Sequence, residues 1–383
     1  MKGNNTATDN QAHSRFDGVD GWRGVACILV LFTHTGFAFG WSPFVIWGFC
    51  GVHIFFVLSG FLLFLPFCEA ILHRRKFPQI GRFFLRRGLR IFPAYCLALF
   101  IFTGLRYITN QSPPSASSFL IHFMLVFNWF DPSEFFAVSA VFWSLAVEAQ
   151  FYVLLPICTW GGQRIFKDKP KTALLGVVAF FVIVGLTSRA VEFLASTSFT
   201  TEHPEWPRFR FVTSFLDFFA CGMVVAYFYI VYGQKNPLSR PLSWLLMLTG
   251  FVVLLSANYY CTLQANGDWM CSGDFGFMVA FGPAVCIGIA AIFLGTVSAK
   301  KNLICRVLES KPLRFIGKVS YGVYLFHFLV QLPMFKVLPL SFISNGQLRC
   351  FCWGLISLGP TLVIAALVFR FVEEPFIRLS KKY

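Results

Sequence analysis

The chain has 383 residues, of which 57% are hydrophobic, 19% are aromatic and 13% are charged, and its formal net charge is +15. Soluble domains carry roughly 25% charged residues, so this composition excludes a disordered chain, a disulfide-stapled secreted module and an ordinary cytosolic enzyme. A polytopic membrane protein is the class that fits, because lipid can solvate this many apolar side chains.

The first 15 residues are polar and rich in Asn and Thr, and they lack the basic start and apolar core of a cleaved signal peptide. We interpret residues 1–15 as a disordered cytosolic tail and residues 16–380 as a single transmembrane domain. A helix needs roughly 20 mostly apolar residues to cross a bilayer. Ten segments meet this requirement, namely 24–42, 45–68, 91–108, 139–160, 173–191, 211–232, 242–261, 275–298, 315–335 and 349–371.

A further apolar stretch, 119–130, is too short to span, and we expect it to be re-entrant or to lie along the interface. Most of the 32 Lys and Arg residues fall in alternate hydrophilic segments that include both termini. The positive-inside rule therefore predicts an all-α membrane protein with about ten transmembrane helices and both termini in the cytoplasm. Because the charge excess is explained by topology, nucleic acid is not an expected partner, and contact of the basic loops with membrane lipid would be nonspecific.

Several ionisable residues fall deep inside the predicted spans, where they are costly and therefore candidates for function. His34 lies eleven residues after Arg23, about 16 Å along the first helix, and eleven steps of 100° place both on one face. Glu148 in the fourth span, His53 in the second and His327 in the ninth fall at similar depth. A hydrogen bond between helices is the structural alternative for each residue, and it is strongest for His53 and His327.

Two local patterns add polar groups to this set. Glu148 follows Ser144 by four residues on one helical face, and a buried carboxylate needs a partner or a proton. Before the third span, Arg87 and Arg90 stand three residues apart at the expected start of a helix. They would suit the phosphates of a nucleotide-bearing acyl donor, and a positive-inside flank is the alternative interpretation.

Six stretches occur in a specific order along the chain: DGWRGVACILVLFTH (20–34), GVHIFFVLSGFLL (51–63), RRGLRIFPAY (86–95), FWSLAVEAQFYVLLP (142–156), GKVSYGVYLFH (317–327) and VEEPFIRL (372–379). Together they resemble the acyltransferase-3 family of integral membrane acyltransferases over residues 16–380. The resemblance implies a ten-helix membrane fold that transfers acyl groups, most often acetyl, from acyl-CoA to hydroxyls. Acceptors in the family include cell-envelope glycans, lipid-linked sugars and macrolide or other small-molecule hydroxyls.

The resemblance also assigns roles to residues. An Arg-x10-His pair falls on Arg23 and His34, a basic pair before the third span falls on Arg87 and Arg90, and a Trp-Ser-Leu-x-x-Glu motif ends at Glu148. Departures from the family pattern, such as His53 where many relatives have Asp, leave the choice of acceptor open. The predicted catalytic residues are His34 and Glu148, and the predicted substrate-binding residues are Arg23, Arg87, Arg90, Tyr95, Trp143, Ser144 and His327.

We expect direct acyl transfer in which His34 takes the proton of the acceptor hydroxyl, because imidazole is a base suited to neutral pH. Glu148 would orient the imidazole or hold the acceptor, and the arginines would bind the phosphates of CoA. A covalent route through Ser144 or Ser59 is the alternative. We expect no metal and no tightly bound cofactor, with acyl-CoA, taken as acetyl-CoA, acting as co-substrate.

The expected partners are the acyl-CoA donor, membrane lipid and a hydroxyl-bearing glycan or lipid-linked acceptor, in the inner membrane of a bacterium. A small-molecule acceptor of the macrolide type is the alternative within the same activity. A transporter or exporter and a noncatalytic scaffold or receptor are the competing classes, since ionisable groups at the midplane also mark transport pathways. The sequence leaves open the oligomeric state, the side of transfer and a disulfide between Cys261 and Cys271, which fall near one outer loop.

Overall fold

The computed structural model describes residues 17–35, 48–109, 112–202, 211–233, 237–264, 275–298 and 302–382. These residues form helices and their connections and contain no β-strand, which confirms the predicted all-α fold. The predicted N-terminal tail, residues 1–15, lies outside the described residues.

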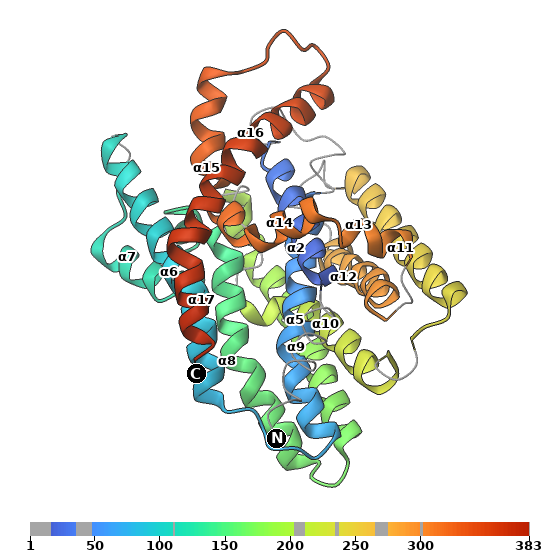
Figure 1. The fold of residues 1–383 in the computed structure, drawn as a ribbon. Coiled ribbons are helices and arrows are strands. Elements are labelled where there is room, and N and C mark those ends of the chain that lie inside the picture. Colours follow the sequence, from blue (N-terminus) through green and yellow to red (C-terminus); the bar gives the residue numbers. More distant parts are fainter. Residues whose placement is uncertain are drawn as a thin grey trace.

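The helices follow one another along the chain in the arrangement shown in Figure 1. They are α2 (Asp17–Thr33), α5 (Cys50–Leu72), α6 (Ile80–Ile108), α7 (Ala116–Phe123), η1 (Phe127–Trp129), η2 (Pro132–Phe136), α8 (Phe142–Ile165), α9 (Pro170–Glu202), η3 (Val212–Phe215), α10 (Leu216–Phe228), η4 (Tyr229–Gly233), α11 (Arg240–Gln264), α12 (Phe275–Val297), α13 (Leu303–Leu308), α14 (Lys311–Lys318), α15 (Ser320–Val337), α16 (Gly346–Val368), η6 (Phe369–Glu373) and α17 (Glu374–Ser380).

Eight helical segments in the described residues are long and apolar enough to cross a membrane, and the bent pair α14–α15 raises this number to nine. The first predicted span, 24–42, corresponds to α2, which has 17 residues and ends just before residues that the structure does not describe. The apolar stretch 119–130 holds α7 and η1, both too short to span, as predicted. The protein is therefore an integral membrane protein.

Two elements differ from the sequence-based prediction. The ninth span was predicted as one segment, 315–335, but α14 and α15 meet at an angle of 76°. The break arises where α14 packs against α2, since a Cβ atom on Gly317 would lie only 1.7 Å from the carbonyl oxygen of Asp20. The third helix begins at Ile80, so the prediction that Arg87 and Arg90 stand at a helix start was wrong. Arginine is a good helix former, and α6 continues through the basic segment.

The centre of the molecule is formed by α5 and α10, which cross through glycine contacts. A Cβ atom on Gly60 of α5 would lie 2.0 Å from the carbonyl oxygen of Phe219, and one on Gly222 of α10 would lie 1.9 Å from that of Val57. Small residues of this kind let helix backbones approach closely inside a membrane, where packing drives association. The contact fixes α5, which supplies one wall of the site described below.

A buried ion pair joins α9 to α10. Arg189 donates from Nη2 to Asp217 Oδ2 at 2.6 Å, and both side chains are almost completely buried. The guanidinium also donates to the carbonyl oxygen of Ser214. Removing one partner of such a pair leaves an uncompensated buried charge, so we assign the pair a structural role.

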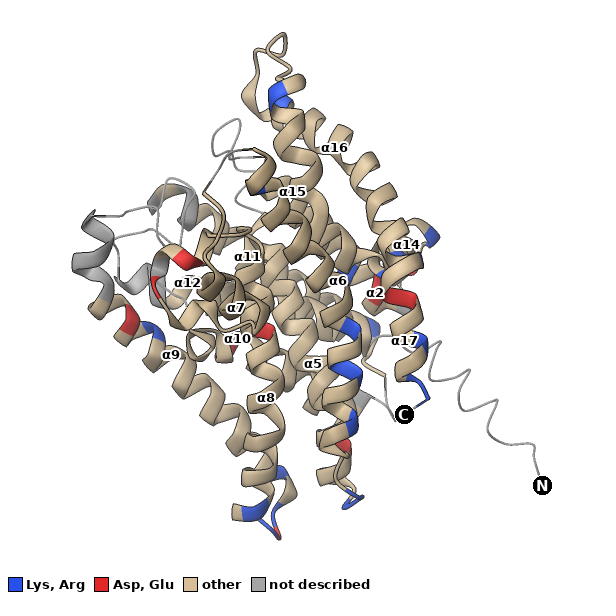
Figure 2. Ribbon diagram, turned by 90° about the vertical axis from the view of Figure 1, so that its left-hand side faces the viewer, with Lys and Arg blue, Asp and Glu red and all other residues tan. Residues whose placement is uncertain are grey.

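Two of the connections that carry basic residues lie at one end of the molecule. Arg74, Arg75 and Lys76 lie between α5 and α6, and Lys167 and Lys169 lie between α8 and α9. Figure 2 shows both connections at the lower end of the view, marked in blue. The grouping fits the charge asymmetry on which the topology prediction depends, and the cytoplasmic orientation of this end remains a prediction.

Candidate functional site

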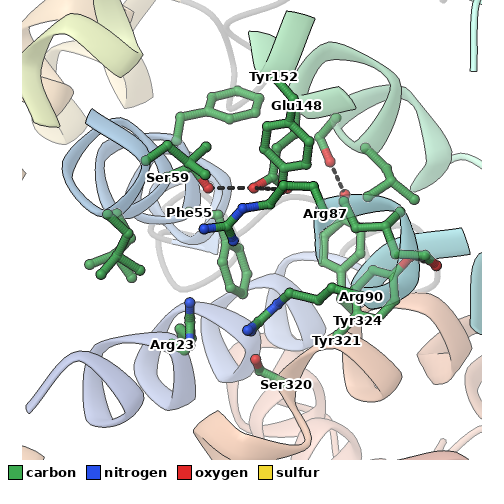
Figure 3. Close-up of a pocket in the computed structure, with 17 residues that line it drawn as sticks. Arg23, Phe55, Ser59, Arg87, Arg90, Glu148, Tyr152, Ser320, Tyr321 and Tyr324 are labelled. Carbon is green, nitrogen blue, oxygen red and sulfur yellow. Dashed lines mark hydrogen bonds between the residues drawn. The ribbon is translucent and has the colours of Figure 1, made fainter. Parts of the chain in front are cut away.

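A pocket with about 800 Å³ of space not filled by atoms, open solvent included, lies among α2, α5, α6, α8 and α15. Figure 3 shows the side chains that line it. They are Arg23, Phe55, Phe56, Leu58, Ser59, Leu62, Leu63, Arg87, Arg90, Ile91, Ser144, Leu145, Glu148, Tyr152, Ser320, Tyr321 and Tyr324.

Three arginines reach this pocket from two helices, Arg23 from α2 and Arg87 and Arg90 from α6, and Figure 3 shows their guanidinium groups pointing toward one another. Arg23 is paired with Asp20 at 3.1 Å. Within the described residues, Arg87 and Arg90 have no hydrogen bond or ion pair, and Arg87 lies 5.9 Å from the ring centroid of Tyr152. Such a group of half-buried guanidinium ions is suited to bind phosphate.

The carboxylate of Glu148 lies in the same pocket. Its Oε1 atom accepts hydrogen bonds from the Ser59 hydroxyl of α5 and from the Tyr152 hydroxyl, the latter at 2.8 Å. Of the hydrogen bonds that the structure gives Glu148 in the described residues, none reaches His34. The pocket therefore combines one carboxylate with three guanidinium groups, and the partners of Glu148 are Ser59 and Tyr152, a question that the sequence left open.

Ser144 has a different partner from the one that its spacing suggested. Its hydroxyl lies 2.5 Å from the hydroxyl of Tyr324, which in turn donates to the carbonyl oxygen of Val141 at 2.8 Å. A phenol has a single hydrogen, so Ser144 must donate to Tyr324. The Ser144 hydroxyl therefore donates to a phenol oxygen, which cannot act as a general base for it. This arrangement disfavours Ser144 as a nucleophile.

His34 is paired with His327 and is not among the residues that line the pocket. The Nε2 atom of His327 lies 3.0 Å from Nδ1 of His34. The Nδ1 atom of His327 lies 2.8 Å from the carbonyl oxygen of Tyr324, and Nδ1 of His34 lies 2.8 Å from that of Val30. Carbonyl oxygens only accept, so in the neutral pair both Nδ1 atoms carry the hydrogen. His34 then keeps its lone pair on Nε2, which is the form that a base requires.

Other predicted residues lie elsewhere in the bundle. Tyr95 is completely buried and donates to the carbonyl oxygen of His122 at 2.7 Å. Trp143 stacks on Phe135 with ring centroids 5.7 Å apart. Neither Tyr95 nor Trp143 is among the residues that line the pocket, and neither is the completely buried His327. Their contact with substrate remains a prediction.

The deep ionisable groups thus divide into three places. His34 and His327 form one pair, and Glu148 lies in the arginine-lined pocket. His53 lies among aromatic side chains, with its ring 5.1 Å from that of Phe218. Sequence spacing gave their depth, and only the packing of the helices could give their neighbours.

The site also contains hydroxyl groups that the sequence analysis did not single out, among them those of Ser320 and Tyr321. The Tyr321 hydroxyl donates to the carbonyl oxygen of Ile91 at 2.9 Å, which ties α15 to α6. Both residues belong to the stretch GKVSYGVYLFH, so polar residues inside an apolar motif were the available signal. Ser59, named only for the covalent route, likewise stands inside an apolar motif.

No group of three or more His, Cys, Asp and Glu side chains that could hold a metal ion occurs in the part of the chain that the structure describes. The expectation of a metal-free and cofactor-free site therefore remains a prediction. The disulfide between Cys261 and Cys271 that the sequence leaves open falls outside the residues whose side chains are described.

Comparison with known proteins adds family relationships. The family model described as "Acyltransferase domain" matches residues 16–372. The "O-acetyltransferase OatA" of Staphylococcus aureus (strain NCTC 8325) is 26% identical over 377 residues, which cover 94% of this chain and 56% of the relative. The "Peptidoglycan O-acetyltransferase OatA" of Listeria monocytogenes is 24% identical over 372 residues, covering 93% and 55% respectively. The chain spans about half the length of these curated relatives. No solved structure matches it.

Proposed function

The chain belongs to the acyltransferase-3 family, and on this basis we propose that it is a membrane O-acyltransferase that moves an acetyl group from acetyl-CoA to a hydroxyl of a cell-envelope glycan. The printed names of the relatives support acetyl as the group and, for the Listeria protein, peptidoglycan as the acceptor. A lipid-linked sugar is the variant of this acceptor. The corresponding location is the inner membrane of a bacterium.

The observation that carries the proposal is the convergence of Arg23, Arg87 and Arg90 on one pocket. Inside a membrane protein, guanidinium groups so close together repel one another and are costly to desolvate, so the cluster requires an anion or water nearby. The N-terminus of α15 begins at Ser320 on the wall of the same pocket without a side-chain cap, and its helix dipole adds positive potential there. The diphosphate of an acyl-CoA is an anion of the required charge and shape.

The second part of the proposal assigns the base. Arg23 lies in α2 and His34 directly follows its last residue, Thr33, so eleven residues at 1.5 Å each separate them by roughly 16 Å along the helix axis. A donor held by its phosphates at Arg23 would therefore extend along α2 through its flexible pantetheine arm to bring the thioester near His34. His327 and the carbonyl oxygen of Val30 both accept from Nδ1 of His34 and so keep the lone pair on Nε2.

The reaction at this base is direct transfer. The hydroxyl oxygen of the acceptor forms a bond to the thioester carbonyl carbon while its proton moves to Nε2 of His34. Collapse of the tetrahedral intermediate breaks the carbon–sulfur bond, and the departing thiolate takes the proton from the imidazolium. Glu148 remains at the donor end, where it holds Ser59 and Tyr152 and offsets the charge of the arginines.

Of the two covalent routes, the one through Ser59 retains a supporting contact, because the Ser59 hydroxyl donates to the carboxylate of Glu148. A carboxylate at this position could accept the serine proton. Rapid mixing of the enzyme with labelled acetyl-CoA in the absence of acceptor separates the mechanisms. Direct transfer predicts no labelled protein, whereas the covalent route predicts label on the protein that Ser59→Ala removes.

The function itself is tested with the full chain purified into nanodiscs, acetyl-CoA labelled in the acetyl group and an envelope glycan extract. The proposal predicts release of CoA thiol matched by label on the glycan, and neither in a reaction without enzyme. Transport of a glycan or solute into sealed vesicles without any dependence on acetyl-CoA would instead indicate a transporter. Failure of the protein to bind acetyl-CoA would overturn the proposed donor.

A further inference from the structure

The pocket among α2, α5, α6, α8 and α15 is called the central pocket from here on. A second, more open depression lies beside it and has no predicted role. It is formed by α5 at Pro66, by the segment before α6 and by the first turns of α6. We call it the arginine groove, and it is lined by Pro66, Pro78, Gln79, Arg82, Phe83, Arg86 and Arg87.

The charge of the arginine groove is uncompensated. Arg82 and Arg86 are exposed, and of the described residues that line the groove none is acidic. Within the described residues, neither Arg82 nor Arg86 has a hydrogen bond or ion pair. By contrast, Arg75 in the preceding connection pairs with Glu69 at 3.3 Å. The groove is therefore a distinct anion-attracting surface within the basic flank.

The arginine groove and the central pocket share one lining side chain. Arg87 lines both. Its guanidinium lies 5.8 Å from the ring centroid of Phe83 in the groove and 5.9 Å from that of Tyr152 in the pocket, and Figure 3 shows it pointing into the pocket. If the phosphates of a long ligand bind Arg87 in the pocket, the part of the ligand that continues toward the groove would lie at Arg82 and Arg86.

We propose that the arginine groove binds the terminal phosphate monoester at the nucleotide end of the acyl-CoA donor, with Arg82 and Arg86 as its ligands. This inference rests on the proposed function, because it takes acyl-CoA as the molecule in the central pocket. A phosphate monoester carries close to two negative charges at neutral pH, which two arginines in neighbouring turns match. Arg82 and Arg86, four residues apart, lie on the same face of α6.

The same phosphate chemistry has a second source, the headgroup of an anionic lipid, since the groove lies in a membrane protein. The two sources differ in what competes for the arginines. Donor binding depends on the 3′-phosphate of CoA whatever the bilayer contains, whereas headgroup binding depends on the lipid and is indifferent to that phosphate.

The test is a binding measurement with the full chain in nanodiscs, by calorimetry with CoA and with 3′-dephospho-CoA, which lacks only the terminal phosphate. The variants are Arg82→Gln and Arg86→Gln, and the control is Lys76→Gln, which removes an exposed charge from the same flank outside the groove. Each measurement is made in phosphatidylcholine alone and with added phosphatidylglycerol. Thermal unfolding checks that every variant is folded.

We expect the wild type and Lys76→Gln to bind CoA about tenfold more tightly than 3′-dephospho-CoA, as for a charge-assisted contact at an exposed site. Arg82→Gln and Arg86→Gln should weaken binding of CoA and leave that of 3′-dephospho-CoA unchanged, in both bilayers. If the wild type bound CoA and 3′-dephospho-CoA equally tightly, this inference would be overturned and the proposed function would stand. Variant effects seen only with phosphatidylglycerol would assign the groove to lipid, and no wild-type binding of either ligand would overturn the proposed donor as well.

Discussion

His34 and His327 are far apart in the sequence, yet they form a hydrogen bond that influences which ring nitrogen of His34 carries the hydrogen. The backbone of α15 holds the hydrogen of His327 on Nδ1, which leaves Nε2 to accept from His34. A neutral imidazole serves as a base through one nitrogen only, and the hydrogen bond of the other nitrogen selects which one. In this account His327 is a positioning residue and His34 is the base.

Replacing His327 tests that division of roles. His327→Ala should lower kcat/KM at least about tenfold and change the pH at which activity falls on the acidic side, because Nδ1 of His34 loses one of its two hydrogen-bond acceptors and is left with the carbonyl oxygen of Val30. His327→Gln should recover part of the activity, since its amide oxygen can accept from Nδ1 of His34. A His327→Ala enzyme with reduced activity but an unchanged pH profile would indicate a purely structural role.

Arg90 provides the corresponding test at the donor end of the site. Its guanidinium reaches the pocket, and in the described residues it has no hydrogen bond or ion pair with the protein. Arg90→Ala should raise the KM for acetyl-CoA about tenfold with a much smaller change in kcat, because the lost contact acts on bound substrate and transition state alike. Steady-state kinetics measure both constants. A lowered kcat with unchanged KM would contradict a role in binding phosphate.

Among the elements, α5 supplies Ser59 to the site and is held against α10 by backbone contacts at Gly60 and Gly222. The next residue after Ser59 is the glycine that permits this contact. Any displacement of α5 at the crossing is therefore transmitted directly to the hydroxyl that Glu148 binds.

Gly60→Ala should accordingly destabilise the protein, by about 1–3 kcal/mol for an overpacked contact that the backbone must relieve. The matched control is Gly104→Ala in α6, where an added Cβ meets nothing within 4 Å and should leave the melting temperature unchanged or slightly raised. Thermal unfolding of the purified proteins compares the two. Equal melting temperatures would show that the close approach of α5 and α10 does not limit stability.

Hydropathy predicted the existence and order of these helices because the length of an apolar segment is a local property. It could not predict that α6 begins at Ile80, since charged residues in a helical turn look like a loop to a hydropathy window. Nor could it predict the break at Val319, which depends on the contact of Gly317 with α2.

The site was predictable to a similar extent. Depth along each helix indicated His34 and Glu148, and the basic pair indicated a phosphate site. Which side chains touch depends on the rotation of helices about their axes. For that reason the sequence left open whether Glu148 reaches His34, and the pairing of His34 with His327 was not foreseen.

At the scale of the whole molecule, the proposed function requires that the arginine-lined end of the pocket face the cytoplasm, where acetyl-CoA is made. The arginine groove and the basic connections α5–α6 and α8–α9 are all placed toward that side by the positive-inside rule. The connection between α15 and α16 should then lie on the opposite side of the membrane.

Cysteine labelling tests this orientation in intact cells. With the native cysteines as background control, Ser344→Cys between α15 and α16 should react with a membrane-impermeant maleimide added outside. Lys169→Cys between α8 and α9 should react only after the cells are permeabilised. The reverse pattern would place the basic loops outside and contradict the predicted topology.

The most direct test of the account compares the wild type with His34→Ala in nanodiscs, measuring release of CoA from acetyl-CoA in the presence of acceptor. Loss of the base should lower the rate by about 10²–10⁴-fold. Affinity for CoA and the melting temperature should stay unchanged, because the phosphates bind at the arginines. A His34→Ala protein that still releases CoA and acetylates the acceptor at the wild-type rate would show that His34 is not the base.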